Sequence, residues 1–256
     1  MGTDSVMHAP RQPRNHRALC VALMLLLGAG ALSCTAADET VEQPIRSVTL
    51  IGDSLADQAQ PVLSSLIAPT ALVSKHFGGT APCDWLGTDF ELDATSVAVV
   101  TFAGNSLTPC MTAADNTSPH GQALVDRYRA DLATLVAEVR ATGARVLIVG
   151  QPVRVGPLPD VAIEVEGINA IAVELANQDG VAFVDAGAAV EDADGRFTVS
   201  LPCLPGEETC GPDGTNVVRS DDGVHFCPGA STFPCLVYSS GAFRFASAIV
   251  EGLNAL

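Results

Sequence analysis

Basic residues are scarce in this chain. Its 256 residues include 13 lysines and arginines against 29 aspartates and glutamates, which gives a formal net charge of −16. Residues 1–33 hold three of the arginines and one aspartate, so the remainder has 10 basic and 28 acidic residues and a net charge of −18. Such a surface repels phosphate backbones and anionic lipid, which argues against nucleic acid as a partner.

Several sequence signatures of enzymes are also missing. The chain has no Gly-x-Ser-x-Gly elbow, no Gly-x-x-x-x-Gly-Lys phosphate loop and no His-Glu-x-x-His motif. It has no internal repeat, and no low-complexity segment beyond a short polar stretch near the N-terminus. These absences argue against three common catalytic scaffolds and against a repeat architecture.

The N-terminal segment has the pattern of an export signal. Arg11, Arg14 and Arg17 precede an apolar run over residues 18–32 that ends in small residues. This run is short for a membrane span and typical of a signal peptide, with a single anchoring helix as the alternative. We therefore expect residues 1–33 to be a signal peptide and the protein to be exported.

The end of this run resembles a bacterial lipobox. Ala31-Leu32-Ser33-Cys34 would place a lipidated cysteine at Cys34, although lipoboxes prefer Leu at the position of Ala31. A polar tether, residues 34–45, follows. The sequence leaves open an anchored lipoprotein and free secretion, so any contact with a membrane is expected only through the signal or a lipid anchor.

The remaining residues, 46–256, predict one domain in which strands and helices alternate. Apolar runs predict strands over residues 47–51, 71–76, 97–102, 146–149 and 181–184. Helical periodicity appears within residues 59–67, 124–139, 168–175 and 243–253, and Pro61 is expected to begin or kink the first helix. A long loop is expected over residues 187–234. Alternating units imply a parallel sheet with helices on both faces and a ligand site at the carboxyl ends of the strands.

Six cysteines lie outside the N-terminal region. They are Cys83, Cys110, Cys203, Cys210, Cys227 and Cys235. An even number in an exported chain indicates three disulfides, and six cysteines allow fifteen pairings. We expect nearest neighbours to pair. A zinc site is the alternative, disfavoured because the chain has no Cys-x-x-Cys and few nearby histidines.

A serine and a histidine near opposite ends of the domain are the candidate catalytic pair. Ser54 follows the first predicted strand, where its hydroxyl and backbone N–H are placed to meet a substrate. His225 can serve as its base, with Asp222 holding the other ring nitrogen and Asp221 as the competing carboxylate. Taken singly, Ser54 has a turn or capping role as its alternative, which is the usual role of serine in Gly-Asp-Ser, and His225 could be a histidine of a surface loop.

Three further residues are candidates for binding an oxyanion. Asn105 follows the third predicted strand and offers a side-chain amide. Gly78 and Gly79 follow the second, where a glycine lets a backbone N–H approach the substrate closely. Ordinary turn roles are the alternative for all three.

In their order and positions these residues resemble the SGNH, or GDSL-type, hydrolases. The four motifs are Gly52-Asp53-Ser54-Leu55, Phe77-Gly78-Gly79-Thr80, Gly104-Asn105-Ser106 and Asp222-Gly223-Val224-His225, within residues 46–255. The family has aspartate where this chain has Ser106. The resemblance implies a three-layer α/β/α sandwich with a flavodoxin-like, parallel five-stranded sheet.

The resemblance also implies an activity. It predicts an esterase that needs no metal or cofactor, with Ser54 as nucleophile, His225 as base and Asp222 as its partner. The oxyanion would be held by the N–H groups of Ser54 and Gly79 or Gly78 and by Asn105. We expect a monomer acting on a small-molecule or carbohydrate ester.

Two other functions remain open. The cysteine-bearing segments resemble those of SGNH domains fused to membrane acyltransferases, so an O-acyltransferase or deacetylase for cell-envelope carbohydrate is one. A catalytically inactive envelope binding module is the other.

Overall fold

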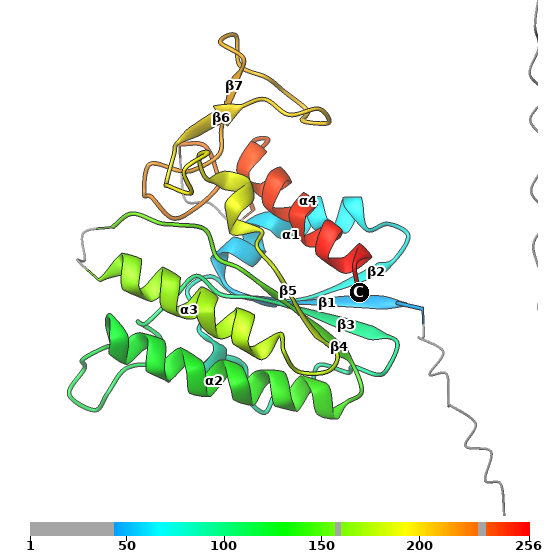
Figure 1. Cartoon of the computed structure of the whole chain (residues 1–256), viewed down its shortest axis with the longest axis vertical. Helices are drawn as coiled ribbons and strands as arrows, with labels where there is room; N and C mark the ends of the chain where they lie inside the picture. The colour runs from blue at the N-terminus through cyan, green and yellow to red at the C-terminus, as the bar shows by residue number, and fades with distance from the viewer. Residues whose placement is uncertain (1–43, 157–159, 230–233) are drawn as a thin grey trace, which may run out of the picture. The chain divides into compact units, whose positions relative to one another are not determined.

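In the computed structural model, five apolar segments form a parallel β-sheet (Figure 1). The strands are β1 (Ser47–Gly52), β2 (Ala71–His76), β3 (Ser96–Thr101), β4 (Arg145–Val149) and β5 (Val181–Val184). Their order is β2-β1-β3-β4-β5, and every neighbouring pair is parallel. This confirms the predicted five-stranded, flavodoxin-like sheet, with strand limits within one or two residues of those expected.

The structure describes residues 44–156, 160–229 and 234–256. These residues belong to one compact unit, Glu42–Leu256. The predicted signal peptide, Cys34 and all but the last two residues of the tether lie outside the described residues. None of the described helices combines the length and the apolar composition needed to cross a bilayer.

Two pairs of helices cover the two faces of the sheet (Figure 1). Helices α1 (Ser54–Leu66) and α4 (Ser240–Asn254) pack together on one face, and α2 (Gln122–Ala141) and α3 (Val161–Leu175) pack on the other. Each face has its own cluster of buried apolar side chains. Because β3 and β4 contribute to both clusters, they are covered on both sides, which explains their unbroken apolar runs.

Helix α1 begins earlier than the sequence predicted. We expected Pro61 to begin or kink this helix, but the helix begins at Ser54 and contains Pro61. The side chain of Asp53 caps it by accepting a hydrogen bond from the N–H of Leu55 at 3.0 Å. The cap fixes the first turn, and this turn carries the candidate nucleophile.

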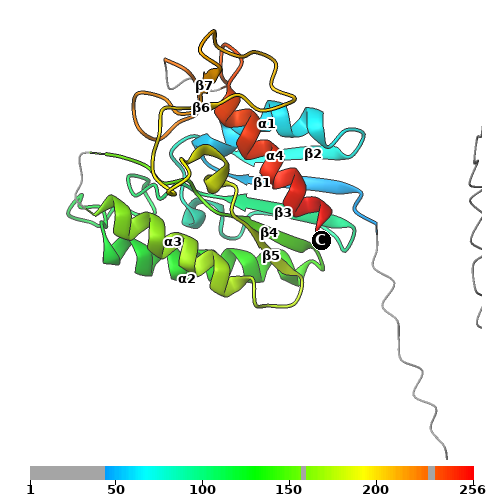
Figure 2. The same cartoon turned by 45° about the horizontal axis from the view of Figure 1, so that its top comes forward.

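The predicted loop over residues 187–234 contains more structure than expected. It begins with a 3₁₀ turn, Gly187–Val190, and includes a two-stranded antiparallel sheet of β6 (Ser200–Pro202) and β7 (Thr215–Val217). Figure 1 and Figure 2 both place β6 and β7 beside the first turn of α4. The strands were missed because short, polar strands have no clear apolar alternation.

A buried ion pair attaches this segment to α4. Arg244 donates from Nε to Glu207 at 2.7 Å, and the two side chains are only 5% and 1% exposed. Ser240 donates to the same carboxylate oxygen, and Asn216 donates to the other. These hydrogen bonds hold the pKa of Glu207 below its ordinary value although burial acts in the opposite direction.

The three disulfides join nearest neighbours, as expected. Cys83 bonds to Cys110, Cys203 to Cys210 and Cys227 to Cys235, with Cα–Cα distances of 6.1, 5.8 and 5.3 Å. The first joins the 3₁₀ turn η1 (Pro82–Trp85) to the segment between β3 and α2. The second lies within the 187–234 segment, and the third joins Cys227 of that segment to Cys235, the residue that follows it.

Candidate active site

The candidate residues gather at the carboxyl edge of the sheet. Gly52, the last residue of β1, is level with His76 of β2 and Thr101 of β3. The segments that follow these strands therefore start side by side. They carry Ser54, the pair Gly78 and Gly79, and Asn105.

Ser54, His225 and Asp222 form one hydrogen-bonded chain. Oγ of Ser54 lies 2.9 Å from Nε2 of His225, and Nδ1 of His225 lies 2.7 Å from Oδ2 of Asp222. Ser54 is 5% exposed. A carboxylate on Nδ1 fixes the ring tautomer that leaves Nε2 able to accept the serine proton. Asp222, and not Asp221, holds this nitrogen.

The turn that carries Asp222 and His225 is stabilised by its own hydrogen bonds. Oδ1 of Asp222 accepts from the N–H of Val224 at 2.8 Å and of His225 at 3.0 Å. The N–H of Ser220 donates to the carbonyl of His225 at 2.7 Å. Gly223 adopts a φ of +77°, which the tight turn requires and which favours glycine. The carboxylate is thus locked in place beside the imidazole.

Arg219 supports this turn from inside the protein, a role that the sequence did not reveal. It is fully buried and donates to the carbonyl oxygens of Val153, Gly223 and Val224 at 2.8, 3.2 and 2.9 Å. Its guanidinium also lies over two aromatic rings, 5.2 Å from that of Phe197 and 5.8 Å from that of Phe226. Burial lowers the pKa of Arg219 to about 10, so it is charged at neutral pH.

Gln58 is a second supporting residue that the sequence did not reveal. It lies on α1 one turn after Ser54 and is 2% exposed. Its Oε1 accepts a hydrogen bond from the N–H of Phe226 at 2.6 Å. This bond ties the residue after His225 to the helix that carries Ser54, so the nucleophile and the base share one support.

Asp53 connects the first and third motifs. Its Oδ2 accepts from the N–H of Ala103 at 2.6 Å and from Nδ2 of Asn105 at 2.8 Å, while Oδ1 caps α1. Nδ2 of Asn105 also lies 3.1 Å from the carbonyl oxygen of Thr80. Asn105 is therefore fixed against β1 and against the segment that follows β2.

Burial raises the pKa of Asp53 to about 6, and the N–H groups of Ala103 and Leu55 act in the opposite direction. Its carboxylate form matches its surroundings, because the three groups that face it are all donors. At neutral pH an ionised Asp53 can hold Asn105 through a charge-assisted hydrogen bond.

A pocket of about 530 Å³ opens beside Ser54. Its lining consists of Ser54, Asp57, Phe77, Gly78, Gly79, Asn105 and His225. The N–H of Ser54 is the first of α1 and has no acceptor within the helix. Among the described residues, the N–H groups of Gly78 and Gly79 also have no hydrogen-bond partner. Residues with free backbone donors and the serine thus line the same space.

A second hollow of about 340 Å³ lies away from this chemistry. It is lined mainly by apolar residues of β1, α1 and α4, such as Val48, Leu66 and Val250. Neither a histidine nor a carboxylate is among its described lining residues. It offers no group able to activate a nucleophile.

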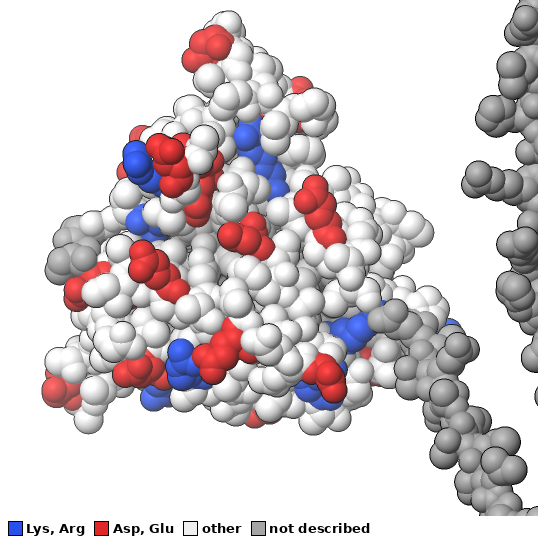
Figure 3. All heavy atoms as spheres, viewed as in Figure 1, with Lys and Arg blue, Asp and Glu red and all other residues white. Residues whose placement is uncertain are grey.

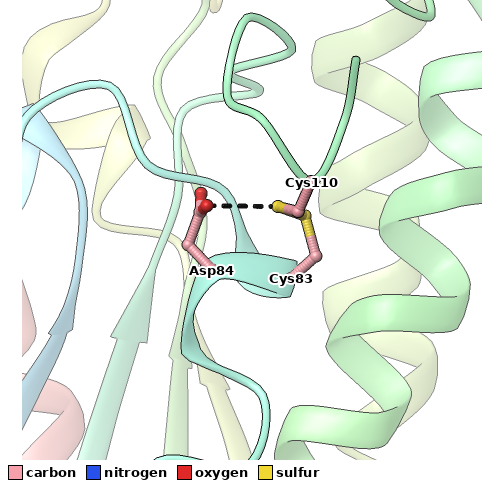
Figure 4. Close-up of side chains that lie close together, drawn as sticks. All are labelled: Cys83, Asp84 and Cys110. Atoms are coloured by element: carbon pink, nitrogen blue, oxygen red, sulfur yellow. Dashed lines mark hydrogen bonds between the residues drawn. A yellow bond between two sulfur atoms is a disulfide. The ribbon is translucent and has the colours of Figure 1, made fainter. Parts of the chain in front are cut away.

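Cys83, Asp84 and Cys110 form a cluster whose ligand atoms lie within 4.8 Å of one another (Figure 4). Oδ1 of Asp84 lies 3.2 Å from Sγ of Cys110. The two sulfurs are bonded to each other, however, and a metal site needs thiolates. As a disulfide, this cluster braces the segment between β3 and α2 and does not supply metal ligands.

Comparison with known proteins identifies the family and the fold. Residues 47–233 match the family described as "Protein of unknown function (DUF459)". No curated protein sequence matches the chain.

Solved structures show the same fold. The C-terminal catalytic domain of peptidoglycan O-acetyltransferase A from Streptococcus pneumoniae is 18% identical, with 83% of this chain and 94% of that chain covered and a TM-score of 0.51. A catalytic mutant of an acetylxylan esterase from Geobacillus stearothermophilus is 14% identical, with 82% and 95% covered and a TM-score of 0.53. A Desulfitobacterium hafniense structure assigned to the lipolytic G-D-S-L family is 12% identical, with 79% and 98% covered and a TM-score of 0.50.

These similarities confirm the resemblance seen in the sequence at the level of fold. The chain has the α/β/α architecture of SGNH hydrolases, a fold used by both esterases and an O-acetyltransferase. At such low identity the likeness concerns the fold, and the chemistry must be argued from the residues of this chain.

Proposed function

The chain belongs to the DUF459 family and has the SGNH hydrolase fold, and from its site we propose that it is an exported serine esterase that cleaves carboxylic esters through an acyl-enzyme. The observation that carries the proposal is the hydrogen-bonded chain from Ser54 through His225 to Asp222, with distances of 2.9 and 2.7 Å. This arrangement can activate a serine hydroxyl.

The reaction follows from the positions of these groups. Oγ of Ser54 attacks the ester carbonyl while Nε2 of His225 takes its proton, and Asp222 stabilises the imidazolium that forms. His225 then gives the proton to the departing alcohol, which leaves an acyl group on Ser54. Water, activated by the same histidine, releases the acid. No cofactor takes part in this scheme.

The negative charge on the carbonyl oxygen needs donors on the opposite side. The N–H of Ser54 and the N–H of Gly79 or Gly78 line the pocket and are available for this role. Asn105 would supply the third donor from Nδ2, sharing a hydrogen that now faces Thr80 or Asp53. Donors of this kind lower the barrier because the charge develops only in the transition state.

Transfer of the acyl group to a sugar hydroxyl is the second candidate. The likeness to an O-acetyltransferase domain favours keeping it, because the same residues serve both reactions. Acyl transfer differs only in the alcohol that replaces water. An inactive binding module is less well supported, because a module without catalysis has no need for the complete Ser54, His225 and Asp222 chain.

Export also belongs to this proposal. Arg11, Arg14 and Arg17 before an apolar run indicate a signal peptide, and three disulfides suit an oxidising compartment. We expect a monomer released from, or lipid-anchored to, the cell envelope.

Replacement of Ser54 by alanine tests the proposal. Turnover of a chromogenic acetate or butyrate ester should fall by about 10³-fold or more, while the circular dichroism spectrum stays unchanged. A fluorophosphonate should label Ser54 and no other serine. Turnover like that of the unaltered protein would refute the mechanism. Added sugars that divert acyl groups from water would identify the protein as a transferase.

A further inference from the structure

The pocket contains a charged side chain that the proposed mechanism does not use. Asp57 lies on α1 three residues after Ser54, so the two side chains are neighbours on the helix surface. It lines the pocket together with Phe77, and its side chain is 18% exposed. The carboxylate is therefore within the space that a substrate would occupy.

His76, at the end of β2, holds Asp57 in place. Nδ1 of His76 and Oδ1 of Asp57 form a hydrogen bond, and the histidine side chain is 14% exposed. Oδ2 of Asp57 has no hydrogen-bond donor among the described residues. The pair thus fixes the carboxylate through one oxygen and leaves the other available to a ligand.

Among the described residues that line the pocket, no lysine or arginine neutralises this carboxylate, and its partner His76 carries a charge only when it is protonated. Lys75, the single lysine of the chain, precedes His76 on β2, and successive side chains of a strand point to opposite faces. Acidic residues also exceed basic ones in the whole chain, 29 against 13, and Figure 3 shows them spread over one face of the molecule. Together, the net charge and Asp57 favour a negative potential in the pocket.

Phe77 adds a second feature to the same pocket. This aromatic side chain is 70% exposed, although large apolar side chains are usually buried. An aromatic face attracts cations, most strongly quaternary ammonium groups, and an adjacent carboxylate adds to that attraction. A neutral acyl chain would gain nothing from Asp57, and an anionic one would be repelled.

We propose that Asp57 and Phe77 form a cation subsite that makes the enzyme prefer esters carrying an ammonium group close to the ester bond. The inference rests on the proposed esterase activity of Ser54 and names its substrate class. His76 acts as a positioning residue for the carboxylate. Esters with a carboxylate or phosphate near the reacting carbonyl are excluded by the same charge.

Two esters of nearly identical shape test the proposal. Acetylcholine and 3,3-dimethylbutyl acetate differ in having a quaternary nitrogen or a carbon at the same place. The ratio of their kcat/KM values should favour the cation by about tenfold or more in the unaltered protein. In Asp57→Asn, which preserves shape and an acceptor for His76, the ratio should fall towards one. Phe77→Leu should lower it in part.

Asp179→Asn is the matched control. It removes the same charge from an exposed position between α3 and β5, at the opposite edge of the sheet. Both kcat/KM values and their ratio should remain unchanged in this variant. A ratio near one in the unaltered protein, or a preference that survives in Asp57→Asn, would overturn the cation subsite while leaving the esterase proposal intact.

A binding measurement separates failure of the subsite from failure of the esterase proposal. Tetramethylammonium chloride is titrated into the protein and followed by NMR, with sodium chloride at equal ionic strength as the reference. If tetramethylammonium changes the chemical shifts of residues near Asp57 and Phe77, and these changes disappear in Asp57→Asn, the subsite is supported even if neither ester is cleaved. If the unaltered protein shows no such shifts, the subsite does not exist.

Discussion

Replacing Gly223 by alanine should distort the turn that carries the candidate base. A Cβ at this position would lie 2.4 Å from Cγ2 of Val155 and 2.6 Å from the carbonyl oxygen of Val155. The side-chain methyl could rotate away, but the carbonyl belongs to the backbone. The N–H of Val155 also donates to the carbonyl of Gly223 at 3.1 Å, so the segments around these two residues cannot move apart without losing this hydrogen bond.

Two separate costs add up in this variant. A left-handed conformation costs an L-residue about 1–2 kcal/mol. Forcing a methyl group into occupied space typically costs a further ~1–3 kcal/mol. We therefore expect Gly223→Ala to lower the free energy of unfolding by about 2–5 kcal/mol. Turnover should fall by about 10²-fold, because a displacement of roughly 1 Å between base and nucleophile is enough for such a loss.

Gly214 provides a control that isolates backbone strain. It has the same φ of +77°, but a Cβ there would meet nothing within 4 Å. It lies in the segment between β6 and β7, outside the pocket. In Gly214→Ala the free energy of unfolding should fall only by the cost of the left-handed conformation, about 1–2 kcal/mol, and turnover should not change.

Urea unfolding of the oxidised proteins at one pH measures the stability difference, and initial rates with an acetate ester measure turnover. The rate of fluorophosphonate labelling reports on Ser54 separately. If Gly223→Ala matches Gly214→Ala in both stability and turnover, then contact with Val155 does not constrain the turn, and the reasoning is wrong.

Three further predictions concern the surroundings of the site. Asn105→Ala should lower kcat by ~10²–10³-fold with little change in KM, and Asn105→Asp should be at least as harmful. If Asn105→Ala keeps more than about a third of the turnover, far above the expected range, another group supplies the oxyanion donor. Reduction of Cys227–Cys235 should lower activity before global unfolding because His225 lies two residues away; full activity in excess dithiothreitol would contradict this link. The pKa of Asp53 is about 6 in the folded protein and 3.8 ordinarily. Between pH 3.8 and about 6, therefore, Asp53 is protonated to a greater extent in the folded protein than in the unfolded chain. The contribution of this group to stability should then fall by about 3 kcal/mol as pH rises across that interval, and urea unfolding between pH 4 and pH 7 should show a matching difference in slope between the unaltered protein and Asp53→Asn.

Apolar patterning was sufficient to predict the sheet, because its three central strands are buried and its two edge strands, although partly exposed, still carry short apolar runs. The unbroken apolar run over residues 97–102 predicted a buried strand, and β3 occupies nearly the same residues. Pro61 misled the prediction for α1 because a local preference was weighed without the cap at Asp53. The short strands β6 and β7 gave no signal, since their pairing depends on the segment as a whole.

The candidate site could be predicted only where its residues lie in recognisable motifs. Ser54 and His225 could be named because each sits in a tetrapeptide of known chemistry. Gln58 could not, because its partner Phe226 lies 168 residues away in sequence. Arg219 could not, because its burial and its hydrogen bond to Val153, 66 residues away, arise only in the folded chain. Asp57 is likewise an ordinary helix residue until β2 places His76 beside it. Such roles arise from packing, and one sequence does not encode them in a local pattern.

The distance along the chain between Ser54 and His225 has a consequence for folding. The two residues meet across 171 positions of sequence. Closing a flexible loop of that length costs about 4–5 kcal/mol of chain entropy, so we expect this contact to form late, after pairing of the intervening strands has shortened the loop. Until then Ser54 is an ordinary, unreactive hydroxyl. With Ser54 as the proposed nucleophile, the rate at which a fluorophosphonate labels it during refolding would therefore report when the whole domain is complete.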